Sequence, residues 1–191
     1  MFTERQNEII NAALDIISSE GIGSLTVKNI GKKLNISDAA LYKHFKNKNQ
    51  IFLGIAKMFE NESNRVLKDI INSDLNCIYK IKAFYMNRIK GFLKNKSTTI
   101  VLFSEEIIND KKFTEKISAI MKNHKKILME EIKRGQKNNK IKDDYSPEHI
   151  FTIIMGALRL LVQKWRLSKF KFNLIKKGEE LCETLEKIIK K

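Results

Sequence analysis

A short segment of the chain places small and basic side chains on one face of a predicted helix. If Leu41 marks the centre of the buried face, a rotation of ~100° per residue turns three side chains to the opposite side: Ala39, Ala40 and Lys43. Such a face can lie deep in a DNA major groove, because alanine methyls can touch thymine methyls and a lysine can reach a guanine edge or a phosphate. The flanking side chains of Tyr42 and His44 can donate to phosphates without reading sequence. The segment therefore predicts a helix that reads DNA.

Two predicted short helices and a tight turn would position this face. The first helix begins at Thr26 and turns three apolar residues inward: Val27, Ile30 and Leu34. The second is predicted over 38–45, and Ser37 is its cap. Asn35 stands between them, and Asn is the next best residue after Gly for a left-handed turn. Two short helices joined in this way are typical of a helix-turn-helix.

A helix is predicted on each side of this motif. The preceding helix starts at a capping box in residues 3–6 and carries an apolar stripe at helical spacing: Ile9, Ile10, Ala13, Leu14 and Ile17. The following helix is predicted over 48–71, with Asn47 as its cap and Gln50 at the capping-box position. Lys48 lies at its start, where backbone N–H groups favour a phosphate.

These residues closely resemble the N-terminal signature of TetR-family repressors. The resemblance covers residues 3–55 and rests on five runs: 12–14, 20–21, 26–31, 35–37 and 41–48. The family usually has Ala at the position of Gly31 and Gly at that of Asn35. Gly31 should cost some helix stability, whereas Asn35 can adopt the same turn.

The resemblance implies a role for each matching residue. The positions that touch DNA phosphates are Thr26, Ser37, Tyr42, His44 and Lys48, and those that face bases are Ala39, Ala40 and Lys43. Lys28 completes the predicted DNA-binding set. The alternative for Tyr42 and His44 is ordinary packing. The family pattern further implies a helix-turn-helix DNA-binding domain over 1–48 and a helical effector-binding and dimerisation domain over 49–191.

Aromatic, methionine and polar residues of the second domain are candidates for an effector pocket. They are Phe59, Tyr85, Arg88, Phe92, Phe103, Met121, His124, Leu128, Met155 and Arg159. Their density favours an apolar or amphipathic small molecule, whose identity the sequence does not give. The alternative is plain core packing for the apolar members and surface positions for the charged ones.

The last two predicted helices indicate a homodimer. Between residues 150 and 162 nearly every residue is apolar, so this helix must be buried on more than one side. The final helix carries leucines and an isoleucine at spacings of seven and four, which suits an intermolecular four-helix bundle. The predicted interface contains Ile154, Leu158, Leu161, Trp165, Leu174, Leu181, Leu185 and Ile188. The alternative is that both helices lie in the core of one chain.

The sequence contains no pattern that predicts catalysis. The three histidines, His44, His124 and His149, are scattered, and none stands in a metal-binding motif. A Gly-rich phosphate loop and a Cys-x-x-Cys pair are also absent from the sequence. We therefore expect a regulator rather than an enzyme, with no metal and no cofactor.

Charge, cysteines and hydropathy fit an all-α, cytoplasmic DNA-binding protein with about nine helices. The net charge of +15 favours a polyanionic partner, although residues 1–48 carry only +2 and residues 49–191 carry +13. The alternative is a basic helical protein that binds acidic membrane surfaces, or DNA nonspecifically.

Cys77 and Cys182 are too few for a disulfide framework, and no signal peptide or membrane span is predicted. The remaining helices are predicted over 76–94, 98–108, 111–138, 147–167 and 172–189.

Overall fold

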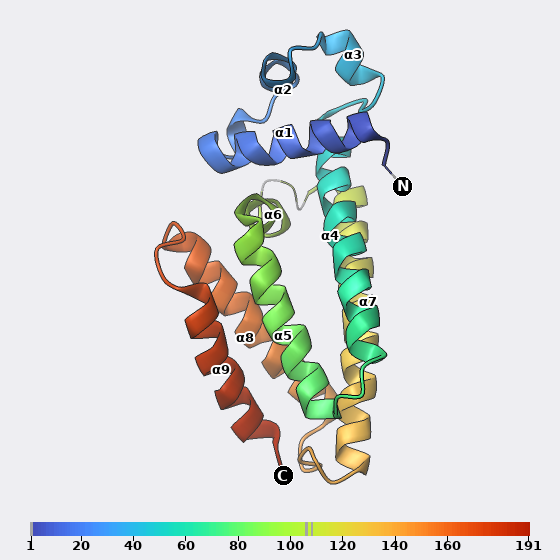
Figure 1. Ribbon diagram of the computed structural model, residues 1–191, viewed down its shortest axis with the longest axis vertical. Coiled ribbons are helices and arrows are strands. Elements are labelled where there is room, and N and C mark those ends of the chain that lie inside the picture. The colour runs from blue at the N-terminus through green and yellow to red at the C-terminus, as the bar shows by residue number, and fades with distance from the viewer. Residues whose placement is uncertain (1, 106, 108) are drawn as a thin grey trace. The chain divides into compact units, whose positions relative to one another are not determined.

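The computed structural model describes residues 2–105, 107 and 109–191. This part of the chain forms nine α-helices and one 3-10 helix and contains no β-strand, which confirms the predicted all-α fold (Figure 1). In chain order the elements are α1 (Glu4–Glu20), η1 (Ile22–Ser24), α2 (Val27–Leu34), α3 (Asp38–Tyr42), α4 (Lys48–Ile71), α5 (Cys77–Lys94), α6 (Lys96–Leu102), α7 (Lys111–Lys137), α8 (Pro147–Leu167) and α9 (Leu174–Ile189).

Side-chain caps explain where several helices begin. At α1 the Gln6 amide donates to Thr3 Oγ1 at 3.2 Å and the Thr3 amide donates to Gln6 Oε1 at 3.1 Å, so the predicted capping box is confirmed. At α4 the Gln50 amide donates to Asn47 Oδ1 at 3.0 Å. At α8 Ser146 accepts from the His149 amide at 3.1 Å. These contacts satisfy N–H groups that the first turn of a helix leaves without partners.

Two helices end several residues before their predicted ends. Helix α3 ends at Tyr42 rather than at Phe45. In the turn that follows, Leu41 O accepts from the His44 amide at 2.9 Å, a three-residue spacing, as well as from the Phe45 amide at 3.0 Å. Helix α6 ends at Leu102, whereas the prediction extended to residue 108. Residues 106 and 108 of that prediction lie outside the described residues.

The chain divides into two compact units. The first contains Met1–Asn61 and Asn95–Ser118, so it extends along α4 beyond residue 48 and takes in α6. Its core is apolar and includes Phe45 and Leu41, the residue predicted to lie at the centre of the buried face of the DNA-reading helix. In Figure 1, α1 lies beside α2.

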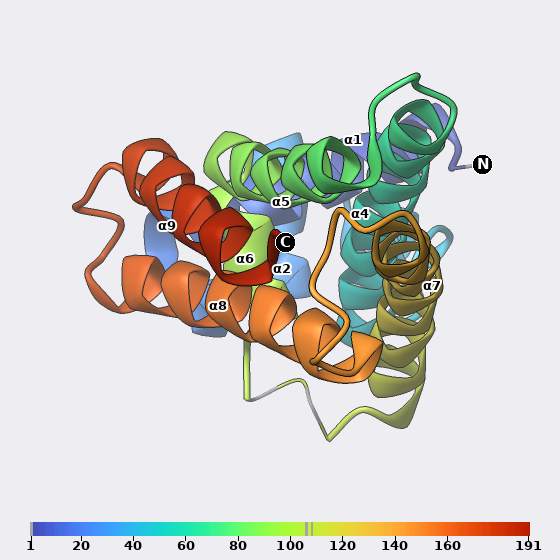
Figure 2. The same cartoon turned by 90° about the horizontal axis from the view of Figure 1, so that it is seen from below.

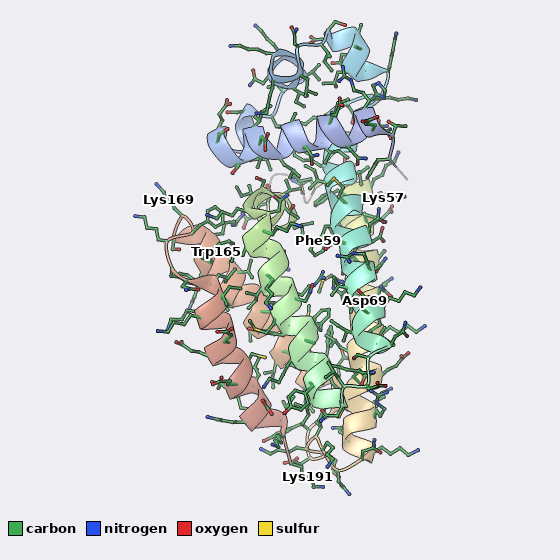
Figure 3. The ribbon with its side chains drawn as sticks, in the orientation of Figure 1. Lys57, Phe59, Asp69, Trp165, Lys169 and Lys191 are labelled. Carbon is green, nitrogen blue, oxygen red and sulfur yellow. The ribbon has the colours of Figure 1, made fainter. Side chains whose placement is uncertain are left out.

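The second unit contains Glu62–Lys94 and Ala119–Lys191. Helices α5, α8 and α9 pack side by side in it (Figures 1 and 2), and Lys82 Nζ on α5 pairs with Glu186 Oε2 on α9 at 2.5 Å. Trp165 ends the apolar stripe of α8 just before the turn that carries Lys169 (Figure 3). Its indole Nε1 donates to Phe172 O across that turn at 3.1 Å. None of the described helices has the length and apolar character needed to cross a membrane.

Candidate functional site

The predicted DNA-facing residues of α3 lie opposite its buried side. Leu41 is completely buried, whereas Ala39 and Lys43 are exposed and Tyr42 has half of its surface exposed. The alanine at position 40 is half-buried. The first unit therefore presents a face of small and basic side chains that an apolar anchor holds from behind, which is the shape that a groove-binding helix needs.

The turn before α3 depends on a matched pair of residues. Asn35 adopts the left-handed conformation at φ 52° and ψ 48°, as predicted. Gly31 lies one turn earlier in α2, where a Cβ atom would approach Ile36 O to 2.8 Å. Because that distance is shorter than a carbon–oxygen contact allows, Gly31 permits the close return of the chain, and this offsets its low helix propensity.

Two hydroxyl groups at the edges of this motif are already placed by the fold. Thr26 Oγ1 accepts from the Asn29 amide at 3.1 Å and caps α2. Ser37 Oγ accepts from the Ala40 amide at 3.2 Å and caps α3. Both side chains belong to exposed residues, and a capping hydroxyl uses only its oxygen. The hydroxyl hydrogen of each remains able to donate to a phosphate.

Basic side chains surround the same motif. Residues 26–48 contain six lysines and one aspartate, a net charge of +5. Lys28 and Lys43 are exposed, and His44 is half-buried. Lys48 is also half-buried, since its ammonium donates to Ile22 O at 3.4 Å and lies 5.4 Å from the centroid of the Phe52 ring. This excess of positive charge is of the sign that attracts phosphates.

The candidate pocket residues are divided between the two units. Phe59 and Phe103 belong to the first unit. Within the second unit, Met121 and Arg159 are exposed and Met155 is half-buried. Tyr85 lines a cavity of about 10 Å³ between α5, α8 and α9, which is room for no more than one water molecule. Burial raises the pKa of the Tyr85 hydroxyl.

Arg88 and His124 come together in the second unit with two residues that were not predicted, Ser63 and Phe84. Ser63 Oγ on α4 lies 2.6 Å from His124 Nε2 on α7. The Phe84 ring on α5 meets the His124 ring edge-on at 5.4 Å, and the Arg88 guanidinium carbon lies 5.7 Å from the centre of the Phe84 ring. We call these four buried residues the Arg88–His124 layer.

Burial sets the charge of this layer. It lowers the pKa of Arg88 to about 10, partly opposed by the carboxylate of Glu62. It lowers the pKa of His124 to about 4, and the nearby charge of Arg88 acts in the same direction. At neutral pH the layer therefore contains one guanidinium charge and one neutral imidazole.

The sequence contains one weak indication that Ser63 is buried against a polar partner. This serine stands one turn from Phe59 and one turn from Leu67, so it interrupts an apolar stripe of α4. A polar residue in such a stripe requires a buried partner.

The eight residues of the predicted dimer interface differ in their burial within the single chain. Five of its eight residues lie in the core of the second unit of a single chain: Ile154, Leu158, Trp165, Leu174 and Leu185. Helices α5, α8 and α9 contact one another in this core, and the Trp165 ring packs edge-on against Phe170. Leu161 and Leu181 are half-buried and Ile188 is exposed. The apolar residues that α8 turns outward are Ile153, Leu160 and Leu167.

Comparison with known proteins covers nearly the whole chain. Residues 9–55 match the model of the bacterial regulatory proteins of the tetR family, and residues 57–188 match that of the C-terminal region of YsiA-like proteins. The fatty acid metabolism regulator protein of Bacillus subtilis is 22% identical over 93% of this chain and 92% of its own length. The nucleoid occlusion factor SlmA of Vibrio campbellii is 26% identical over 98% and 97%.

A similar fold occurs in the crystal structure of the transcriptional regulator FadR from Bacillus subtilis in complex with stearoyl-CoA. The TM-score is 0.78 at 21% identity, and the match covers 94% of this chain and 96% of that one. The exposed face of α3, the caps around it and the two family matches all indicate the same class of DNA-binding protein. This chain belongs to the tetR family of bacterial regulatory proteins and is a ligand-responsive DNA-binding transcriptional regulator.

Proposed function

We propose that this chain is a cytoplasmic, homodimeric repressor that binds a palindromic operator and releases it when an amphipathic effector binds in the second unit. The observation that carries the proposal is the exposed face of Ala39, Tyr42 and Lys43 above the buried Leu41. The proposed function is binding rather than catalysis.

The proposed dimer uses the outward face of α8. Ile153, Leu160 and Leu167 follow one another at seven-residue spacing, and their exposed fractions are 43%, 54% and 70%. A stripe of large apolar side chains this exposed favours a protein partner. A second copy related by a two-fold axis would cover the same stripe on both chains and would set two α3 helices against two half-sites.

The proposed effector has a long apolar chain. The similar regulator from Bacillus subtilis was crystallised with stearoyl-CoA, and the second unit offers aromatic and aliphatic side chains on α5 and α7. Helix α4 carries both Lys48 at its start and Ser63 of the Arg88–His124 layer. A ligand that shifts Ser63 can therefore act on the DNA-binding end of the same helix, provided that its affinity differs between the two states.

Selection from a pool of random duplexes tests the DNA part of the proposal. We expect the bound fraction to converge on an inverted repeat whose half-sites lie about one helical turn, or a multiple of it, apart. Binding that shows no sequence preference, or selection of a single half-site, would contradict the proposed dimeric repressor. The change Tyr42→Phe removes one hydroxyl and leaves the ring, so it should weaken binding without changing the selected sequence, as expected for a phosphate contact.

A further inference from the structure

One acidic side chain lies within the DNA-binding motif. Residues 26–48 contain six lysines, whereas Asp38 is the only acidic residue among them. Asp38 is the first residue of α3, and it is exposed. Its Oδ1 lies 3.4 Å from the position that a Cβ atom on Gly31 would occupy, so the carboxylate lies at the turn between α2 and α3.

Helix α3 does not need this carboxylate for its cap. Ser37 Oγ already accepts from the Ala40 amide at 3.2 Å. An acidic residue in a first turn also favours the helix dipole, but solvent screens this effect at an exposed position. In the first turn of α3, residues 38–41, Asp38 has the only polar side chain. It is therefore the only side chain of that turn that can form a hydrogen bond with DNA.

The negative charge limits what this side chain can contact on a duplex. Phosphates repel a carboxylate and attract the lysines around it. An ionised carboxylate only accepts hydrogen bonds, and the major groove offers it two kinds of donor, the N4 amino group of cytosine and the N6 amino group of adenine. Because the N-terminal residues of a recognition helix contact base edges, Asp38 lies at a position where one of these groups can be read.

Cytosine fits a carboxylate better than adenine does. Adenine presents the N7 acceptor beside its N6 amino group, and this acceptor repels the second oxygen of a carboxylate. Cytosine presents its N4 amino group in the groove and no acceptor of its own. An asparagine, by contrast, has both a donor and an acceptor and matches the edge of adenine.

We propose that Asp38 reads a cytosine in each half-site of the operator by accepting a hydrogen bond from the N4 amino group of that base. This inference rests on the proposed function and specifies one base of its operator. The neighbouring side chains of Ala39 and Ala40 offer only methyl groups, so the carboxylate gives this turn its choice between bases. It also disfavours DNA that places no amino group opposite it, which increases specificity.

Selection from random duplexes tests the inference with four full-length proteins: the unchanged chain, Asp38→Asn, Asp38→Ala and Glu20→Gln. We expect the unchanged chain to prefer cytosine at one position of each half-site. Asp38→Ala should lose the preference at that position, and Asp38→Asn should change it to adenine. Glu20→Gln removes the same charge from an exposed position at the end of α1 and should select the same sequence as the unchanged chain.

The affinity for duplexes that differ in that one base pair gives the size of the effect. Replacing the cytosine in one half-site should weaken binding by the unchanged chain about 5- to 150-fold. The same replacement should hardly affect binding by Asp38→Ala. Ser37 keeps its cap in every variant, so we expect all four proteins to fold alike.

The outcomes separate this inference from the proposed function. If selection converges on an inverted repeat and both Asp38 variants keep the same bases, Asp38 reads no base and the proposed repressor stands. If one position changes with Asp38 but the unchanged chain prefers a base other than cytosine there, the cytosine assignment is wrong. If the unchanged chain shows no sequence preference, the proposed function fails and this inference fails with it.

Discussion

The two units differ in whether their acidic and basic side chains are exposed or buried. In the first unit, the residues that we assign to DNA are exposed or half-buried, and no acidic or basic side chain among its described residues is buried. In the second unit four such side chains are buried: Lys80, Arg88, His124 and Glu131. Both units contain the same kinds of helix, so the difference does not come from secondary structure.

We infer that this difference reflects what each unit binds in the proposed function. A duplex is large and approaches from solvent, so an apolar core behind an exposed face is sufficient. A small molecule must be surrounded, so its polar contacts have to lie inside, where they reduce stability while the site is closed. We therefore expect substitutions to impair the function of the first unit mainly at its surface and that of the second unit mainly in its interior. The outward stripe of α8 is the exception.

The largest effect is expected at that stripe. Leu160→Glu would place one charge from each chain in the proposed dimer interface. We expect the free energy of dimerisation to weaken by about 4 kcal/mol, or roughly 1000-fold in dimer affinity. Sedimentation at micromolar concentration should then show monomers. Asn138→Glu adds the same charge at an exposed position after α7 and should leave the dimer intact. A wild-type chain that sediments as a monomer would contradict the proposed interface.

Acid should weaken the second unit through His124. The pKa of a histidine is about 6.5 in an unfolded chain and is lowered to about 4 here by burial and by Arg88. Between these values the unfolded chain binds more protons. The free energy of unfolding is therefore unaffected by this group above about pH 6.5 and falls by about 3 kcal/mol as the pH drops to about 4.

Urea unfolding at two pH values measures this effect. Wild-type protein should lose more stability between about pH 7.5 and about pH 4.5 than His124→Gln does. His149→Gln, which changes an exposed histidine of α8, should behave like the wild type. Equal acid sensitivity of all three proteins would mean that His124 is not held neutral in the folded chain.

A smaller effect on stability is expected at one turn in each unit. Asn35 and Asn139 both have positive φ, 52° and 54°, and an alanine in that conformation costs about 1–2 kcal/mol. Both changes to alanine should lower stability by this amount, and both changes to glycine should be nearly neutral. Only Asn35→Ala should also weaken operator binding, because it alters the turn before α3. If Asn139→Ala weakens operator binding equally, stability rather than turn geometry explains the loss.

Local signals made much of the first unit predictable. The capping box at Thr3, the cap at Ser37 and the left-handed turn at Asn35 each depend on neighbours within a few residues, and the structure confirms all three. The exposed side of α3 followed from a single buried anchor, Leu41. The prediction extended that helix to Phe45, beyond its end at Tyr42, because the residue types do not indicate where a helix end tightens.

The second unit was predicted less well because its site depends on which faces of long helices meet. Arg88 and His124 were candidates among ten residues, but their partners Ser63 and Phe84 come from two different helices. The stripe over 150–162 indicated burial on two sides, yet it did not indicate which side the chain itself would cover. Leu160 lies on the outward side, while Leu158 is buried within the chain.

Binding of operator and of random DNA, measured against salt, tests the assignment of α3 most directly. Lys48→Ala should weaken both kinds of DNA in the same proportion and reduce the salt slope by about one for each phosphate that the chain no longer binds, or about two for a dimer. Ala39→Leu enlarges an exposed side chain on the groove face. It should lower operator affinity by roughly 1–3 kcal/mol for each base contact disturbed, and leave random DNA and its salt slope nearly unchanged. If both variants change the two kinds of DNA in the same proportion, α3 does not read the operator.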